Sequence, residues 1–250
     1  MPESLKSRML RGETLVGTFV KTPAIEMVEV LGRSDLDFLC LDAEHAAFDR
    51  GRLDACLAVA RAMDVPCLVR VPVGSPDMLL TTLDAGATGI VVPHVDTVEK
   101  ARAIAKGARF GHGGRGFAGS TRWAGFATRS MPEILQQSID ETVVIAQIEE
   151  PEGVEAADAI AAVEGIDGLF VGPADLAVSQ GLPGGDPKVM EQMAATGAAA
   201  RGAGKAFMTW TAGAANAAAL RDAGVTMFFV ASEHAFMLKG ANAEAAAIRR

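Results

Sequence analysis

The chain has 250 residues, of which 50% are hydrophobic and 22% charged, and it carries a formal net charge of −8 at pH 7. This length and apolar content suit one large buried core, so we expect a single domain over residues 1–250. An acidic chain is not attracted to nucleic acid or to an anionic membrane, which excludes both as expected partners.

The cysteines and the ends of the chain bear on its location. Cys40, Cys56 and Cys67 form no Cys-x-x-Cys motif and no close pair. Two of them fall inside expected strands, where a reduced cysteine acts as a small apolar side chain. No basic-then-apolar leader opens the chain, and no apolar run reaches the length of a membrane span. We therefore expect a cytoplasmic protein.

Strand-like and helix-like segments alternate along the chain. Residues 1–12 are a charged, helix-prone opening whose Leu5, Met9 and Leu10 could cover the bottom of a barrel. Apolar runs typical of buried parallel strands follow. These runs span 14–20, 37–42, 66–72, 87–93, 142–149, 167–172, 205–210 and 225–231. Helical patterns span 24–31, 50–63, 76–85, 97–107, 131–139, 151–163, 173–179, 189–202, 212–223 and 233–248.

Eight strand-plus-helix units predict an α/β fold of the (β/α)₈ or TIM barrel type. An open doubly wound sheet would more often have fewer strands and a glycine-rich first turn. In a barrel, residues just past the carboxyl ends of the strands share one mouth. We therefore look for a functional site among those residues.

Two acids stand at the carboxyl ends of neighbouring expected strands. Glu149 closes one strand, and Asp175 follows the next. Two carboxylates that face each other repel unless a proton or a cation lies between them, and oxygen ligands favour Mg²⁺ or Mn²⁺. Taken singly, Asp175 is interpreted as the N-cap of the following helix. Taken as a pair, the two acids favour a metal site.

The loop after the second strand places Asp42, Glu44 and His45 within four positions. Histidine titrates nearest to neutral pH, and a neighbouring carboxylate can orient its ring as a base. We expect His45 to be catalytic, with Asp42 as its orienting partner. Asp49, which ends this loop, is interpreted as the cap of the next helix.

Arg70 lies inside the apolar third strand, where it needs an anion or a carbonyl to bond. We expect it to reach a ligand in the barrel mouth, and a structural ion pair with Asp42 or Asp84 is the alternative.

His94 also follows a strand, but a single histidine at such a position is weak evidence of a functional role. Segment 109–130 is rich in glycine and long for a barrel loop, which is typical of a lid or a subunit contact. It lacks the spacing of a nucleotide-binding motif.

Several of these residues fall in motifs that resemble the HpcH/HpaI aldolases, which are metal-dependent class II pyruvate aldolases of the 4-hydroxy-2-oxoheptanedioate aldolase type. The similarity is clear from about residue 15 to residue 179 and looser beyond, and the last motif is the most specific. The motifs are Asp42-Ala-Glu-His45, Arg70-Val-Pro72, Leu83-Asp84-Ala-Gly-Ala87, Gly114-Arg-Gly116, Gln147-Ile-Glu149 and Gly165-Ile-Asp-Gly-Leu-Phe-Val-Gly-Pro-Ala-Asp175-Leu.

The resemblance implies a barrel of the phosphoenolpyruvate/pyruvate type that reversibly cleaves 4-hydroxy-2-oxoacids to pyruvate and an aldehyde. It implies that Glu149 and Asp175 hold a Mg²⁺, Mn²⁺ or Co²⁺ ion and that His45 is the acid/base centre. It also implies that Asp42 and Asp84 support this histidine, Asp84 from across a subunit contact.

The same resemblance implies the remaining contacts of the substrate and the assembly. Arg70 would contact the pyruvate oxygens, Gln147 would lie beside the substrate, and the backbone of Gly172, Pro173 and Ala174 would receive its carboxylate. Family members are homotrimers or homohexamers that often exchange their final helix between subunits, so we expect such an assembly with a small-molecule substrate.

Elementary chemistry agrees with these roles. Breaking the C3–C4 bond leaves electrons on pyruvate C3, which requires a cation near the C2 oxygen. A base must take the C4 hydroxyl proton, and His45 is available. No lysine falls at an expected strand end in the middle of the barrel, because Lys205 opens its strand and so belongs to the opposite face. The Schiff-base route of class I aldolases is therefore disfavoured.

Two positions depart from the family pattern. They bear on which aldehyde the enzyme prefers and not on the reaction that it catalyses. His94 stands where many relatives carry a residue that does not titrate. Trp210 either narrows the mouth of the barrel or only packs against neighbouring side chains.

Two other functions remain as alternatives. One is a citrate-lyase-β or malyl-type lyase that acts on an acyl-CoA, for which the acidic net charge is unfavourable. The other is a catalytically silent barrel that binds an oxoacid.

Overall fold

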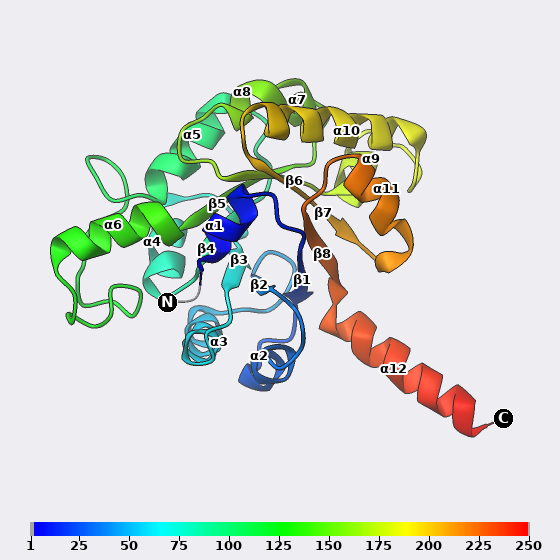
Figure 1. Ribbon diagram of the computed structural model, residues 1–250, viewed down its shortest axis with the longest axis horizontal. Helices are drawn as coiled ribbons and strands as arrows, with labels where there is room; N and C mark the ends of the chain where they lie inside the picture. The colour runs from blue at the N-terminus through cyan, green and yellow to red at the C-terminus, as the bar shows by residue number, and fades with distance from the viewer. Residues whose placement is uncertain (1–2, 250) are drawn as a thin grey trace.

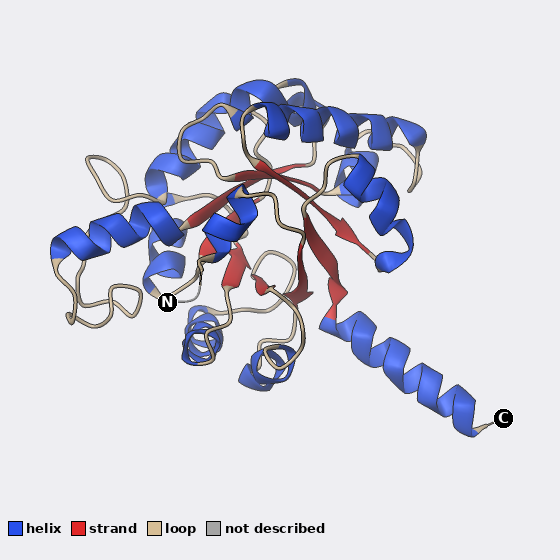
Figure 2. Cartoon of the chain, viewed as in Figure 1, coloured by secondary structure: helices blue, strands red, loops and turns tan. Residues whose placement is uncertain are grey.

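The computed structural model describes residues 3–249 as a closed barrel of parallel strands ringed by helices (Figures 1 and 2). The strands pair in chain order, and the last closes against the first. They are β1 Leu15–Val20, β2 Phe38–Asp42, β3 Cys67–Arg70, β4 Gly89–Val92, β5 Val143–Ile148, β6 Gly168–Val171, β7 Ala206–Thr211 and β8 Met227–Ser232. The prediction of a (β/α)₈ barrel is confirmed.

The helices follow the predicted order. They are α1 Leu5–Leu10, α2 Ile25–Leu31, α3 Arg50–Ala62, α4 Pro76–Asp84, α5 Val98–Gly107, α6 Met131–Glu141, α7 Pro151–Glu155, α8 Ala157–Ala161, α9 Pro173–Ser179, α10 Pro187–Gly202, the 3₁₀ helix η1 Ala214–Asn216, α11 Ala217–Asp222 and α12 Glu233–Ile248. Figure 2 shows them as an outer layer around the central strands. The cap predicted for α3 is confirmed, because the Asp49 carboxylate accepts the Arg52 N–H at 2.7 Å.

Three expected elements differ from the observed ones. The strand expected at 66–72 is shorter, because the prolines at its two ends cannot donate to the ladder of hydrogen bonds. The helix expected at 151–163 is two helices that meet at Ala156, where ψ is 2°. The helix expected at 212–223 begins late, with a 3₁₀ turn after the extended Gly213.

Side chains of each strand alternate between the barrel interior and the layer that faces the helices. On β2, Cys40 belongs to the interior cluster, whereas Leu39 and Leu41 belong to the outer one. On β3, Leu68 is interior and Cys67 is outer. Both cysteines are buried as expected, and burial raises the pKa of the Cys67 thiol to about 12.

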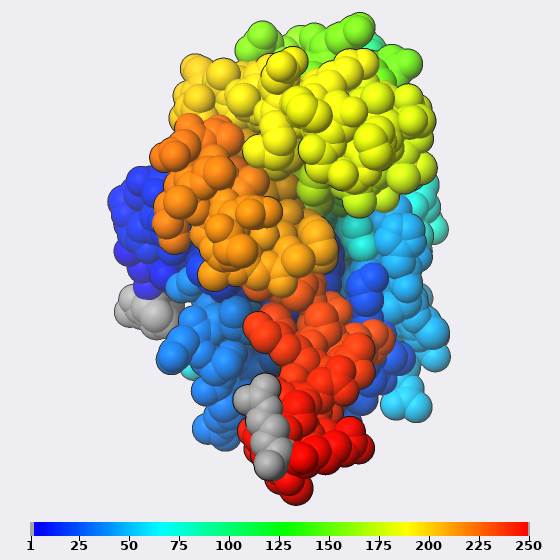
Figure 3. All heavy atoms as spheres, turned by 90° about the vertical axis from the view of Figure 1, so that its right-hand side faces the viewer, coloured from blue at the N-terminus to red at the C-terminus, as the bar shows by residue number. Residues whose placement is uncertain are grey.

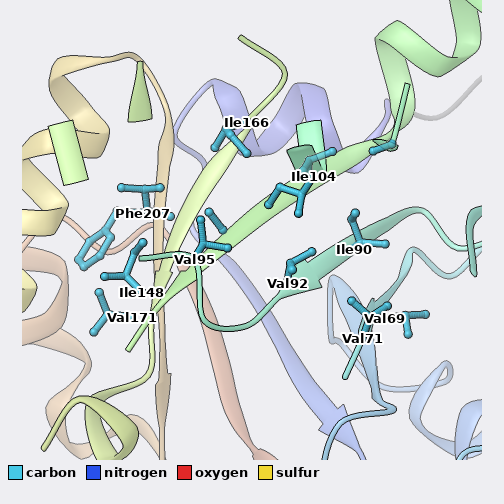
Figure 4. Close-up of a cluster of buried hydrophobic side chains, with 14 of the residues drawn as sticks. Val69, Val71, Ile90, Val92, Val95, Ile104, Ile148, Ile166, Val171 and Phe207 are labelled. Carbon is cyan, nitrogen blue, oxygen red and sulfur yellow. The ribbon is translucent and has the colours of Figure 1, made fainter. Parts of the chain in front are cut away.

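Figure 4 shows part of the outer layer, where strand and helix side chains interlock. Val92 of β4, Ile148 of β5 and Val171 of β6 are each at most 2% exposed and share one cluster with Ile104 of α5. Burial of apolar surface stabilises such a layer by about 25 cal/mol per Å². This packing holds the strand ends, and the polar residues beyond them, at fixed positions.

Helix α1 covers the amino-terminal end of the barrel. Leu5 and Met9 are 3% and 1% exposed and join the interior cluster with Leu15, as expected for a barrel cover. Leu10 was expected on the same side, but it is 43% exposed. Met1 and Pro2, the first residues of the predicted opening segment, lie outside the described residues.

Gly89 marks a close approach between β4 and β5. A Cβ atom there would lie 2.3 Å from the carbonyl oxygen of Val143, its partner in the ladder. Because that oxygen belongs to the backbone, Gly89→Ala is expected to reduce the free energy of unfolding by about 1–3 kcal/mol, as measured by urea denaturation. Gly184→Ala is the control, because a Cβ there meets nothing within 4 Å. Equal stability of the two variants would contradict the prediction.

Helix α12 runs away from the barrel in Figure 1 and forms the lower edge of the molecule in Figure 3. Within this helix, all of which the structure describes, Glu233 is the buried residue. Met237 and Leu238 are 51% and 65% exposed. A helix of this length is marginal in water without packing, so the free apolar side chains call for a partner surface. No helix within residues 3–249 is long and apolar enough to cross a membrane.

Candidate active site

Strand alternation carries polar residues into the carboxyl-end mouth of the barrel. Asp42 ends β2 two positions after the inward Cys40, and Arg70 ends β3 two positions after the inward Leu68. The register pairs Asp42 directly with Arg70. The same alternation sends Glu149 inward just beyond the end of β5.

Asp42 and Arg70 form a buried ion pair with two hydrogen bonds. Arg70 Nε and Nη2 donate to Asp42 Oδ1 and Oδ2 at 3.0 and 2.8 Å. Burial by itself would raise the pKa of Asp42, but the hydrogen bonds and charge of Arg70 outweigh it and lower this pKa. Arg70 Nε also lies 3.2 Å from Glu44 Oε2, and its guanidinium stacks 4.5 Å from the centre of the Phe19 ring. An ion pair between Arg70 and Asp42, which was one of the expected alternatives for Arg70, is therefore confirmed.

Asp84 is not near this mouth in its own chain. It ends α4, which leads into the amino end of β4, and it accepts hydrogen bonds from Arg115 Nε and Nη2 at 3.1 and 2.5 Å. The Arg115 guanidinium stacks on Phe110 and Trp123 within segment 109–130. The alternative pairing of Arg70 with Asp84 is therefore wrong.

His45 lies at the rim, and its ring is more than half exposed. Asp42 Oδ1 accepts the backbone N–H of His45 at 3.2 Å, so it fixes the loop rather than the ring. The carboxylate nearest to the ring is Glu44, with 3.6 Å between Oε2 and Nε2, and not Asp42 as expected. Burial raises the pKa of Glu44, although the charge of Arg70 opposes this effect.

Glu149 is 4% exposed and held from two sides. Gln147 Nε2 donates to its Oε2 at 2.5 Å, and the backbone N–H of His94 donates to its Oε1 at 2.8 Å. Gln147, which was expected beside the substrate, is thus a partner of Glu149. Such contacts orient a carboxylate in the way that outer-shell residues orient metal ligands.

The residues at this point fit a divalent cation. One oxygen each of Glu44 and Glu149 and one nitrogen of His94 lie within 4.8 Å of one another. Glu44 Oε2 is buried and accepts no hydrogen bond from the residues that the structure describes, although the charged Arg70 Nε lies 3.2 Å away. Buried carboxylates repel one another unless a positive charge lies between them, and carboxylate and imidazole are ordinary metal ligands. This donor set could hold a divalent ion, and it contains Glu149 but not Asp175, the other acid expected to bind the ion.

Asp175 is the third residue of α9, and the N-cap of that helix is Gly172. The alternative that Asp175 is only an N-cap is therefore wrong. A Cβ atom on Gly172 would lie 2.8 Å from Asp175 Oδ2, so glycine leaves room for this carboxylate. The register pairs Ile148 with Val171, which makes Glu149 and Gly172 the next residues along adjacent strands. The two acids thus belong to neighbouring strand ends, as predicted.

A cavity of about 220 Å³ opens at the mouth. Trp210, which is 38% exposed, forms part of its wall, so this side chain narrows the mouth rather than only packing. The cavity is lined by Phe19, Lys21, His45, Arg70, Phe170, Gly172, Pro173, Ala174, Asp175 and Trp210. A larger hollow of about 900 Å³ is lined instead by residues such as Lys6 of α1, Arg102 of α5 and Asp167, which directly precedes β6, so it lies away from the carboxyl ends of the strands.

Lys21 is a site residue that the sequence reasoning missed. It directly follows β1, lines the cavity, and places Nζ 3.3 Å from Asp42 Oδ2. The expectation that no lysine stands at the carboxyl end of a strand is therefore wrong. The position of Lys21 at the end of an apolar run could have identified it, as the same position identified Asp42. Its partner is a carboxylate, however, and not the apolar or cationic surroundings that free an amine for Schiff-base chemistry.

The closed barrel and the cavity at its mouth, which is lined by a lysine, a histidine, an arginine and one carboxylate, fit a barrel enzyme with a small-molecule substrate. The family model "HpcH/HpaI aldolase/citrate lyase" matches residues 15–239. The chain is 33% identical to a hydroxypyruvate/pyruvate aldolase of Paraburkholderia phytofirmans over 245 residues, which cover 94% of this chain and 93% of the relative.

Two further comparisons agree. A 4-hydroxy-2-oxovalerate aldolase of Rhodococcus jostii is 34% identical, with 81% of this chain and 79% of the relative covered. The crystal structure of a family protein from Burkholderia cenocepacia J2315 superposes with a TM-score of 0.93 at 33% identity, covering 98% of this chain and 99% of that one. The chain belongs to the HpcH/HpaI aldolase/citrate lyase family. It is a carbon–carbon lyase of the aldolase type.

Proposed function

We propose that this enzyme reversibly cleaves 4-hydroxy-2-oxoacids to pyruvate and an aldehyde with the help of a bound divalent metal ion, Mg²⁺, Mn²⁺ or Co²⁺. The observation that carries this proposal is the cluster of Glu44, His94 and Glu149 beside the buried Arg70. The aldolase names of relatives that match most of the chain support the same reaction.

Each side chain has a role that follows from its position. Glu149 and Asp175 would hold the ion, with Gln147 fixing the orientation of Glu149. When bound, the ion would offset the negative charge that develops on the substrate's 2-oxo oxygen as the C3–C4 bond breaks. Arg70, whose pKa the Asp42 carboxylate raises against the effect of burial, stays charged and binds the oxygens of the oxoacid.

The proton steps fall to the loop after β2. His45 Nε2 would take the C4 hydroxyl proton during cleavage and return it during addition, with Glu44 the nearest carboxylate to the ring. The exposed position of His45 lets the ring reach a substrate seated in the cavity. Gly172, Pro173 and Ala174 line that cavity, and the backbone of this segment would receive the substrate carboxylate.

The most direct test is exchange of the C3 protons of pyruvate in deuterated water, followed by NMR. We expect exchange by the metal-loaded enzyme, its loss with EDTA, and recovery on adding Mn²⁺ or Mg²⁺, because the charge on the 2-oxo oxygen is then offset again. A catalytically silent oxoacid-binding barrel would give no exchange under any of these conditions. Full exchange by the chelated protein would refute the metal requirement.

We also propose a homotrimer or homohexamer in the cytoplasm. The free apolar side of α12 supports an exchange of this helix between subunits, because its exposed Met237 and Leu238 would then be covered. Asp84 lies away from the mouth of its own chain, so a catalytic role for it would require that it serve the site of a neighbouring subunit.

A further inference from the structure

His94 has an unusual backbone conformation. It follows Pro93 just beyond β4, with φ of 57°, in the left-handed region that residues other than glycine seldom adopt. This conformation presents two groups of the same residue to one oxygen: the N–H lies 2.8 Å and the ring Nδ1 3.0 Å from Glu149 Oε1. Strained backbone that persists in a packed fold clusters at functional sites.

The separation of Nδ1 and Oε1 matches that of two ligands on one ion. Ligand atoms that bind an ion at about 2.1 Å and at right angles to each other lie about 3.0 Å apart. Nδ1 of His94 and Oε1 of Glu149 are 3.0 Å apart. In the same cluster an oxygen of Glu44 lies within 4.8 Å of one ligand atom each of His94 and Glu149, and the Glu44 side chain is 10% exposed.

His94 has one competing partner, Glu150, whose Oε1 lies 2.5 Å from Nδ1. The His94 side chain is 61% exposed, and exposed ion pairs contribute little to stability. Such a pair does not explain why the backbone of His94 is held in a strained conformation. Glu149, by contrast, is buried and has its second oxygen fixed by Gln147, so the orientation of its first oxygen toward His94 is set by the fold.

We propose that His94 Nδ1 is a third protein ligand of the divalent ion, beside Glu149 and Asp175. The inference rests on the proposed function, since it concerns the same ion. A nitrogen donor changes the selectivity of the site, because imidazole suits Co²⁺ and Zn²⁺ whereas Mg²⁺ prefers oxygen alone. The enzyme is then tuned toward transition metals.

Calorimetric titration of the metal-free full-length enzyme tests this selectivity. His94→Asn removes the ring nitrogen but keeps a residue that tolerates left-handed φ. We expect a loss of Co²⁺ affinity of at least about 10- to 100-fold, the range seen when even a partner of a metal ligand is changed, with little change for Mg²⁺. His112→Asn, at an exposed position of segment 109–130, is the matched control and keeps both affinities. Equal loss of Co²⁺ and Mg²⁺ affinity in His94→Asn would overturn the inference.

Pulsed electron paramagnetic resonance of the Mn²⁺-loaded enzyme gives a second readout that is independent of turnover. We expect nitrogen hyperfine coupling in the wild type and in His112→Asn, and its absence in His94→Asn. If the wild type binds Mn²⁺ and exchanges pyruvate protons without nitrogen coupling, the proposed function stands and the inference is overturned. If the protein binds neither Mn²⁺ nor Co²⁺, both are overturned.

Discussion

Glu149→Gln is expected to remove metal binding and catalysis together while the fold stays intact. The substitution keeps the shape of the side chain but removes the charge of a carboxylate that is 4% exposed and faces Glu44 and His94. Because a metal ligand is lost rather than a partner of one, we expect Mn²⁺ affinity and pyruvate proton exchange each to fall by more than about 100-fold. Calorimetry and NMR exchange measure the two quantities.

Stability separates this effect from simple misfolding. Glutamine at position 149 keeps one side-chain oxygen, which can accept the His94 N–H, and its new amide group can donate to Gln147 Oε1, which has no partner among the described residues of the wild type. The substitution also relieves the repulsion from Glu44. The free energy of unfolding of the metal-free protein should therefore be unchanged or higher. Glu152→Gln is the matched control, since Glu152 is exposed in the first turn of α7. Retention of tight metal binding by Glu149→Gln would mean that the ion lies elsewhere.

Arg70→Met is expected to abolish activity and also to destabilise the fold. Asp42 is 0% exposed, and its carboxylate would lose both hydrogen bonds from the guanidinium. Removing one partner of a buried ion pair typically costs about 3–5 kcal/mol, because the remaining charge is left without compensation. Urea denaturation should show a loss of this size, and pyruvate proton exchange should disappear.

The pH dependence of this loss has a definite sign. In the wild type the folded-state pKa of Asp42 is lowered, so its stabilising contribution is present above the unfolded-state pKa, which is about 3.9, and is lost as the pH falls through the folded-state value. Without Arg70, burial is the main effect and raises this pKa. The variant is then least stable at neutral pH relative to the wild type, and the difference should shrink toward about pH 4.

Two further variants make the Arg70 result specific. Asp42→Asn combined with Arg70→Met should recover part of the stability, because no buried charge remains, but none of the activity. Arg102→Met is the control: that arginine is 70% exposed, and its loss should change stability by no more than about 0.5 kcal/mol. A pH-independent loss of stability in Arg70→Met would argue that packing against Phe19, rather than charge, dominates.

Much of the barrel could be predicted because a strand that is buried on both faces has an apolar local composition. Runs such as 37–42 and 167–172 are apolar on both faces, and the observed strands β2 and β6 lie within them. The helix expected at 151–163 breaks at Ala156 although alanine is a good helix former, so local helix propensity does not predict the break. Ends of elements depend on packing more than on propensity.

The candidate site was predicted in part, and the misses share a cause. Lys21 was overlooked although it directly follows a strand, and Asp42 proved to hold the backbone of His45 rather than its ring. The contact of Glu44 with Arg70 joins residues that are far apart in the chain. Which carboxylate meets which cation at a barrel mouth depends on side-chain direction within a shared space, and no sequence spacing specifies that.

By itself, the sequence determined the number and order of the strands and which residues stand at their carboxyl ends, because the two-residue period of a strand and its apolar burial are local properties. Only the tertiary structure decided that Glu149 is held by Gln147 and His94, that Asp84 pairs with Arg115, and that the described part of α12 beyond Glu233 leaves Met237 and Leu238 exposed. The reason is that these contacts arise from strand register and helix packing, which bring together groups that local sequence treats as independent.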